Sequence, residues 1–154
     1  MTLRDTMEAF AARYPRAERI RFDPVEIPHG YPDPRDVEVS ALICASLAYG
    51  RVDLFKPKLE ELHRRMGGSP AAFVRELRVD EAASWLRSFV YRFNVGTDLA
   101  VLLMGIGAAL GEHGSLEALF VRELEAAGGS VEKALGGFTR AIRAGAPLGS
   151  CGGR

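Results

Sequence analysis

Residues 37–49 read VEVSALICASLAY, a run of thirteen residues with a single charge, at Glu38. A segment of this length that is apolar nearly all round is typical of a helix buried in a protein interior. Asp33-Pro34 precede the run as helix-entry signals, and Gly50 follows it where a helix would end. We therefore expect a helix that starts near Asp36 and forms the buried centre of the fold.

The rest of the chain shows the same helical period. The first of these segments, residues 3–13, places Leu3, Met7 and Phe10 on one face, and no segment alternates apolar and polar residues as a half-buried strand would. Five prolines in residues 15–34 predict an extended segment. The sequence predicts an all-α fold with about seven or eight helices around the buried helix. Helical spacing occurs over 3–13, 53–66, 70–77, 80–89, 97–111, and after the capping residues Ser115 and Ser130.

Composition indicates one helical domain over 1–154, because 154 residues and 47% hydrophobic content are typical of a globular chain. Twenty basic and twenty acidic residues give zero net charge, which argues against DNA binding driven by bulk charge but leaves a local basic patch open. The longest uncharged run, 99–111, is too short to span a bilayer, and the N-terminus lacks a signal-peptide core. We expect a cytoplasmic protein without a membrane partner, and a disordered tail at 146–154.

A first group of chemically competent residues lies at the start of the predicted central helix. His29, Asp33, Arg35 and Asp36 fall within eight residues, with Tyr31 and Glu38 nearby. They could line a polar substrate site. The alternative is structural, with Asp33 and Asp36 capping the helix and His29 in a turn. Their spacing fits no metal-ligand motif, so no metal and no other cofactor is expected.

Two further groups combine aromatic rings with arginine. Tyr49, Gly50 and Arg51 would stand at the exit of the predicted central helix, and Tyr91-Arg92 follow the segment that carries the only tryptophan. Tyrosine and arginine can stack on bases and bind phosphate, and glycine allows close backbone approach. The alternatives are an ordinary helix C-terminus for the first group and core aromatic packing for the second.

Nucleophilic catalysis finds no support in the sequence. Cys44 lies among apolar residues and is expected to be a buried, inert thiol. His63 and His113 fall on polar helix positions where solvent exposure is expected, so no base is paired with a nucleophile. No catalytic residue is therefore assigned, and a small enzyme that uses the His29–Asp36 group ranks last among the hypotheses.

Several blocks of this sequence resemble, in the same order, a bacterial protein family known as domain of unknown function 2400. The Asp-Pro-Arg-Asp and Ala-Tyr-Gly-Arg blocks are specific when they occur together. The resemblance covers roughly residues 20–151. The blocks are 23–29, Tyr31, 33–36 with Glu38, 47–52, 91–93, 114–117 with Phe120, and 149–151.

The resemblance implies a link to DNA. Members of that family are longer, and their second half carries an Asp-Thr-His-like motif similar to the catalytic-aspartate region of helix-hairpin-helix DNA glycosylases. By that analogy this chain is a partial glycosylase-like domain that lacks the catalytic half, and Tyr49, Gly50 and Arg51 would face the nucleic acid with local, low-affinity contacts. The alternatives are a non-catalytic interaction module, which meets a partner chain or a second copy through exposed apolar helix faces, or a truncated gene product.

Overall fold

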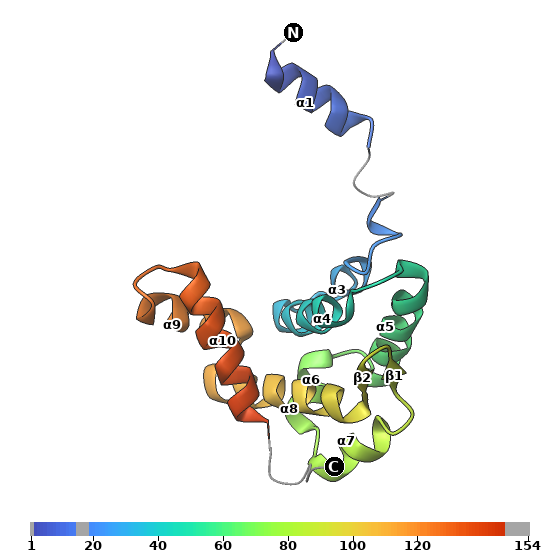
Figure 1. Cartoon of the computed structure of the whole chain (residues 1–154), viewed down its shortest axis with the longest axis vertical. Coiled ribbons are helices and arrows are strands. Elements are labelled where there is room, and N and C mark those ends of the chain that lie inside the picture. The colour runs from blue at the N-terminus through green and yellow to red at the C-terminus, as the bar shows by residue number, and fades with distance from the viewer. Residues whose placement is uncertain (1, 15–18, 147–154) are drawn as a thin grey trace.

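The computed structural model describes residues 2–14 and 19–146, and within these ranges the chain is mainly helical (Figure 1), as the sequence predicts. A single pair of two-residue strands accompanies the helices in the described part. The elements are α1 (Leu3–Ala12), α3 (Glu26–His29), α4 (Pro34–Leu47), α5 (Val52–Met66), α6 (Pro70–Glu76), α7 (Val79–Trp85), β1 (Val90–Tyr91), β2 (Asn94–Val95), α8 (Gly96–His113), α9 (Leu116–Ala126) and α10 (Val131–Gly145).

The centre of the fold is α8, not the helix that the sequence places there. Helix α8 contacts α6, α7, α9 and α10, and its Leu99, Leu103 and Ile106 are almost fully buried. Two of its glycines allow close helix packing. A Cβ on Gly105 would lie 2.2 Å from the Ile142 carbonyl oxygen of α10, and one on Gly107 would lie 2.1 Å from the carbonyl oxygen of Val74 in α6. Only glycine fits at such distances.

Helix α4 is buried on one side only, which corrects the prediction of a helix enclosed all round. Val39, Ile43 and Leu47 enter the core, whereas Ala41 and Ala45 are exposed. The prediction was wrong because a side that carries only small residues lacks charges yet need not be covered by protein. The predicted start is close to the observed one, since the Asp33 side chain caps the helix at Pro34. The helix ends at Leu47, two residues before the predicted end.

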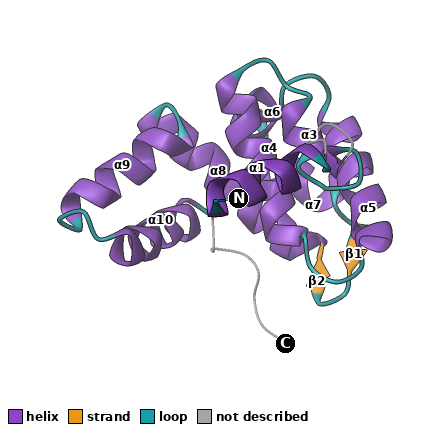
Figure 2. Cartoon of the chain, turned by 90° about the horizontal axis from the view of Figure 1, so that it is seen from above, coloured by secondary structure: helices purple, strands orange, loops and turns teal. Residues whose placement is uncertain are grey.

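Helices α9 and α10 lie side by side and pack on α8 away from α3, α5 and α7 (Figure 2). Phe120 and Phe138 join the pair edge to face, with ring centroids 6.2 Å apart. On the predicted apolar face of α10, Ile142 is buried, whereas Val131 and Leu135 are 56% and 52% exposed. The beginning of that face is therefore about half exposed to solvent.

Three local features differ from the sequence-based expectation. The proline-rich segment contains the single turn α3, which is possible because Pro28 lies within its first turn and no N–H donor is missed there. Helix α7 ends at Trp85 rather than near Phe89, and the chain then forms the β1–β2 hairpin, which pairs Val90 with Val95 and Tyr91 with Asn94. Strands of two residues are too short to show alternation. The predicted tail lies outside the described residues except for Ala146, which is buried.

Helix α1 is amphipathic but buries none of its residues. It projects from the rest of the molecule in Figure 1, and its Leu3, Met7 and Phe10 are more than half exposed. Among the described residues, no single helix is long and apolar enough to cross a membrane. Helices α8 and α9 reach that length and composition only together, across a bend of 75°.

Candidate nucleic-acid interface

The residues predicted to form a site separate into two groups at opposite ends of α4. The group around Asp33–Asp36 starts the helix, and the group around Tyr49–Arg51 follows its end. A helix of 14 residues is about 21 Å long, at 1.5 Å per residue. The two groups therefore cannot act on one small ligand.

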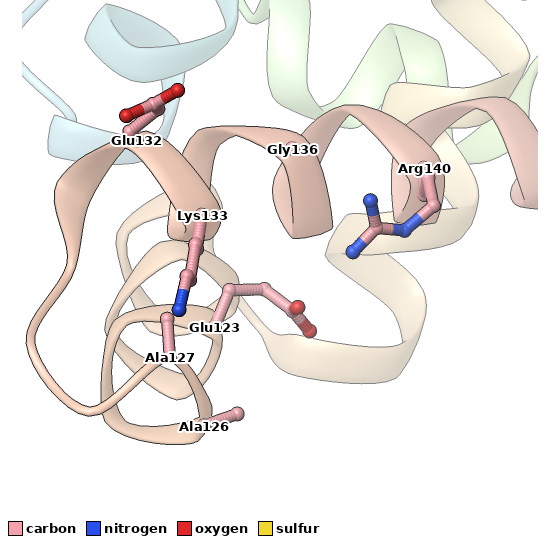
Figure 3. Close-up of a pocket in the computed structure, with 7 residues that line it drawn as sticks. All are labelled: Glu123, Ala126, Ala127, Glu132, Lys133, Gly136 and Arg140. Carbon is pink, nitrogen blue, oxygen red and sulfur yellow. The ribbon is translucent and has the colours of Figure 1, made fainter.

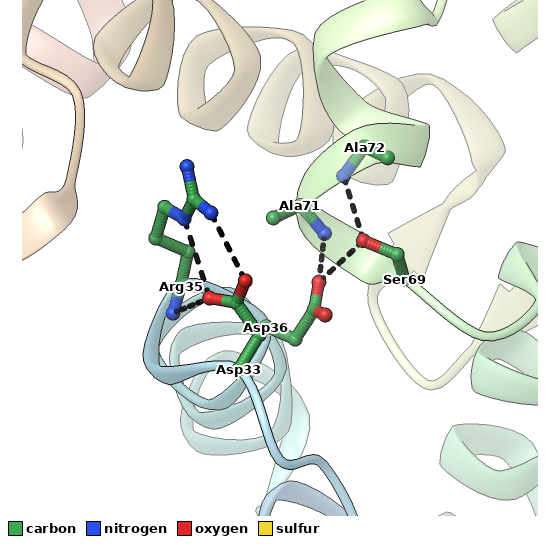
Figure 4. A network of polar contacts seen from close by, with 6 residues as sticks. All are labelled: Asp33, Arg35, Asp36, Ser69, Ala71 and Ala72. Carbon is green, nitrogen blue, oxygen red and sulfur yellow. Dashed lines mark hydrogen bonds and ion pairs between the residues drawn. The ribbon is translucent and has the colours of Figure 1, made fainter.

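The carboxylates at the start of α4 are capping groups. Asp33 accepts a hydrogen bond from the Arg35 N–H at 2.8 Å and pairs with the Arg35 guanidinium at 3.0 Å. Asp36 is 5% exposed and accepts hydrogen bonds from the Ser69 hydroxyl and the Ala71 N–H, both at 2.8 Å (Figure 4). Asp36 thus caps α6, a helix 35 residues further along the chain, rather than its own helix.

Glu38 has the same role toward a third helix. Its carboxylate accepts a hydrogen bond of 2.8 Å from the backbone N–H of Leu116, the first residue of α9. Because Asp33, Asp36 and Glu38 each satisfy free N–H groups at a helix start, the structure assigns them to helix capping. His29 is exposed at the end of α3. The arrangement therefore favours the structural alternative for this group.

The second and third predicted groups come together. The Tyr49 hydroxyl donates to the Tyr91 carbonyl at 3.2 Å, and the Tyr91 hydroxyl donates to the Tyr49 carbonyl. The two rings lie 5.2 Å apart, and the Asn94 amide donates to the Tyr49 hydroxyl at 2.9 Å. This reciprocal pair fixes the end of α4 to the hairpin β1–β2, although 42 residues separate the two tyrosines.

Gly50 and Arg92 meet at this junction, and both have left-handed backbone conformations. Gly50 has φ +90°, and a Cβ added to it would lie 2.6 Å from the Arg92 guanidinium. Arg92 has φ +52° and is the only described non-glycine residue with a positive φ. Such a conformation costs free energy in a non-glycine residue and is common at functional sites. Glycine at position 50 leaves the space that the guanidinium occupies.

The outer surface of the junction combines an exposed ring with exposed guanidiniums. Phe93 is 89% exposed at the tip of the hairpin, whereas Val90, which pairs with Val95 at the other end of the hairpin, is 55% exposed. Arg51 is exposed and pairs with Asp53 at 2.5 Å. Arg92 is exposed and forms no ion pair with any other described residue. This surface can stack on a flat ring and bind an anion.

The sequence did not predict the buried pair that Ser40 and His63 form. The Ser40 hydroxyl and His63 Nε2 lie 2.9 Å apart, and His63 Nδ1 contacts the Leu59 carbonyl at 2.8 Å. Burial lowers the pKa of His63, and the bond to Leu59 opposes that shift. The expectation that His63 is exposed was wrong, because its spacing from Leu59 and Met66 puts it on the apolar face of α5. Ser40 has no exposed surface, so no substrate reaches the pair.

Cys44 and His113 complete the residues considered for nucleophilic catalysis. Cys44 is 4% exposed, and burial raises the pKa of its thiol to about 11. This confirms the prediction that the cysteine is buried, and the raised pKa disfavours the reactive thiolate. The His113 side chain is only 11% exposed and lies 3.4 Å from Glu112, so the expectation of an exposed histidine was wrong there as well.

A larger groove between α9 and α10 was not predicted. It has a volume of about 490 Å³, and its lining includes Lys133, Gly136 and Arg140 of α10 and Glu123 of α9 (Figure 3). Glu132 adds a second carboxylate to the lining. The two cations and two anions balance, so charge favours neither an anionic nor a cationic ligand.

Among the described residues, no three His, Cys, Asp or Glu side chains are grouped as ligands for a metal ion.

Comparison with known families matches residues 23–151 to a family described as protein of unknown function (DUF2400). The chain belongs to this family. The matched region runs from the segment before α3 to beyond α10, and it contains both the helix-capping carboxylates and the Tyr49–Tyr91 junction. Neither the curated proteins nor the solved structures include a match to this chain.

Proposed function

We propose that this DUF2400 chain binds DNA at the surface formed by residues 49–51 and 91–93, as the DNA-contacting part of a glycosylase-like protein. One observation carries the proposal. Two sequence blocks that resemble the family pattern are joined by the Tyr49–Tyr91 hydrogen bonds, and together they present Arg51, Arg92 and Phe93 to solvent.

The chemistry of this surface fits a disturbed duplex better than an intact one. An exposed phenylalanine can stack on a base, and stacking requires a base whose face is accessible. Arginine side chains bind phosphate oxygens and position the protein on the backbone. Because the net charge is zero, long-range attraction is weak and the affinity depends on these local contacts. No catalytic residue is assigned to the chain.

Fluorescence anisotropy with labelled duplexes tests the proposal. The wild-type chain is expected to bind a duplex with an abasic site more tightly than the matched undamaged duplex. Phe93→Ala should remove most of this preference, since base stacking contributes about 1–3 kcal/mol per base. Val90→Ala, on the same hairpin and also exposed, is the matched control and should bind like the wild type.

Salt dependence separates the role of the arginines from that of the ring. Arg92→Ala should lower the slope of log K against log salt concentration by about 0.9, the value for one lost phosphate contact. Phe93→Ala should leave the slope unchanged. Equal affinity for damaged and undamaged duplex, together with no effect of Arg51→Ala or Arg92→Ala, would refute DNA binding at this surface.

A further inference from the structure

Gly50 differs from the other described glycines that have a left-handed backbone. Gly67, Gly114, Gly128 and Gly129 each donate their N–H to a carbonyl of the helix that they follow, which is the usual role of a glycine after a helix. A Cβ on any of these four would meet no atom within 4 Å. Gly50 donates no such hydrogen bond to α4 among the described residues. Closing the helix therefore does not explain a glycine at position 50.

The contact that Gly50 does make is with the face of the Arg92 guanidinium. A Cβ added to Gly50 would lie 2.6 Å from Nη2 of Arg92, and 2.8 Å from both Cζ and Nε. Because these distances are nearly equal, the Cβ would stand over the plane of the group rather than beside one of its edges. The N–H groups of a guanidinium point outward in its plane. Packing one face on Gly50 therefore leaves these donors free to meet a ligand.

The tyrosine pair sets this alignment. Tyr49 and Tyr91 exchange hydrogen bonds, and Gly50 and Arg92 are the next residues in the two segments. The hydrogen bonds of the junction join Tyr49, Tyr91 and Asn94 and do not include the Arg92 side chain. That side chain also forms no ion pair with another described residue. Charged donors that are held in place without a protein acceptor suit an anionic ligand.

We propose that Gly50 is a positioning residue, which holds the Arg92 guanidinium so that its outward N–H groups meet a phosphate oxygen of the bound nucleic acid. This inference rests on the proposed DNA binding and deepens it. A mobile arginine loses rotamer freedom when it binds, whereas a guanidinium packed on Gly50 has lost that freedom beforehand. Any Cβ at position 50 would displace the guanidinium. Because this group is the far end of a flexible side chain, it can move without disturbing the core.

Nuclear magnetic relaxation of the Arg92 Nε–H group tests the positioning without a ligand. Its signal is identified as the one that Arg92→Lys removes. In the wild type its heteronuclear NOE is expected to approach that of the backbone, and in Gly50→Ala it should fall to that of a freely mobile side chain. Gly114→Ala is the matched control, because Gly114 has φ +83° and open space around it, and it should leave the Arg92 signal unchanged. A mobile Arg92 in the wild type would overturn the proposal.

Fluorescence anisotropy with the abasic duplex then measures the consequence for binding. Gly50→Ala should raise the dissociation constant by about tenfold or more, as Arg92→Ala does, because a charge-assisted hydrogen bond is lost. It should also lower the slope of log K against log salt concentration by about 0.9, the value for one phosphate contact. The double variant should bind no more weakly than Arg92→Ala, because both substitutions remove the same contact. Gly114→Ala should bind like the wild type.

The outcomes separate this role of Gly50 from DNA binding itself. If Arg92→Ala weakens binding and Gly50→Ala does not, the positioning role is overturned and DNA binding stands. If the wild type binds neither duplex, the proposed function fails, and the phosphate-directing role of Gly50 fails with it. Should Gly50→Ala not fold, Gly50→Asn replaces it, because asparagine tolerates a positive φ but still carries a Cβ. The same losses are expected of Gly50→Asn, and wild-type affinity and salt dependence in that variant would overturn the proposal.

Discussion

Two glycines of the same helix should respond in opposite directions to the same substitution. A Cβ at Gly107 in α8 would lie 2.1 Å from the carbonyl oxygen of Val74, which is backbone and cannot rotate away. Gly111, four residues further along α8, is exposed, and a Cβ added there would have no neighbouring atom within 4 Å. The pair therefore separates packing from backbone entropy within one element.

The magnitudes follow from these contacts. Alanine gains about 0.5–1 kcal/mol over glycine inside a helix, because glycine loses more conformational freedom on folding. At Gly107 that gain is opposed by overpacking, which costs about 1–3 kcal/mol in a close-packed core. Moving α6 and α8 apart by about 1 Å to admit the Cβ would cost an amount at the upper end of this range, because the interior is close-packed. We expect Gly107→Ala to lose about 2–2.5 kcal/mol net, and Gly111→Ala to gain about 0.5–1 kcal/mol.

Urea unfolding followed by circular dichroism at 222 nm measures both free energies of unfolding. Thermal melts should agree, since about 1 kcal/mol shifts the melting temperature of a domain of this size by about 2–4 °C. Gly105→Ala is a second test of the same packing, because its Cβ would meet the Ile142 carbonyl of α10. If Gly107→Ala stabilised the chain as much as Gly111→Ala does, the close packing of α6 on α8 would be refuted.

Three other predictions concern buried polar groups. Burial lowers the pKa of His63 in the folded chain below its ordinary value near 6.5. Below about pH 6.5 the unfolded chain therefore binds a proton at this histidine that the folded chain does not bind, and the free energy of unfolding should fall as the pH drops. His63→Gln should remove that part of the pH dependence in urea titrations, and an unchanged slope would contradict it. Asp36→Ala should lower the free energy of unfolding by about 2–3 kcal/mol, because two donors lose a charged acceptor. Asp33→Ala should lower it by only about 1 kcal/mol, because Asp33 is an exposed helix cap. Equal losses of stability in urea unfolding would contradict this assignment. In a Cys151→Ser background, Cys44 should react with a thiol reagent at pH 8 only after unfolding, and fast labelling of the native chain would show that the thiol is accessible.

The start of α4 shows which features a local sequence pattern can predict and which it cannot. Asp33-Pro34 predicted the helix start, because a capping side chain and a proline act on neighbouring backbone groups. The same reasoning made Asp36 a cap of its own helix. In the structure Asp36 caps α6 and Glu38 caps α9. Spacing identified carboxylates suited to capping but not the helices they would cap, because those lie 35 and 78 residues away.

The candidate interface was predicted as two separate groups. Tyr49-Gly50-Arg51 and Tyr91-Arg92 each stood out by residue type. The hydrogen bonds that join the two tyrosines depend on how the hairpin packs, and no local pattern reports that. The left-handed backbone of Arg92 was likewise invisible, because arginine has no sequence preference for it.

The sequence by itself determined the all-α class, most helix positions and the burial of Cys44. These depend on periodicity, capping and local composition, which act over a few residues. Only the tertiary structure decided that α8 rather than α4 is central and that one side of α4 is exposed. Those outcomes depend on which surfaces meet. Small uncharged side chains such as those of Ala41 and Ala45 can be buried or exposed at little difference in free energy, so their own composition does not determine the result.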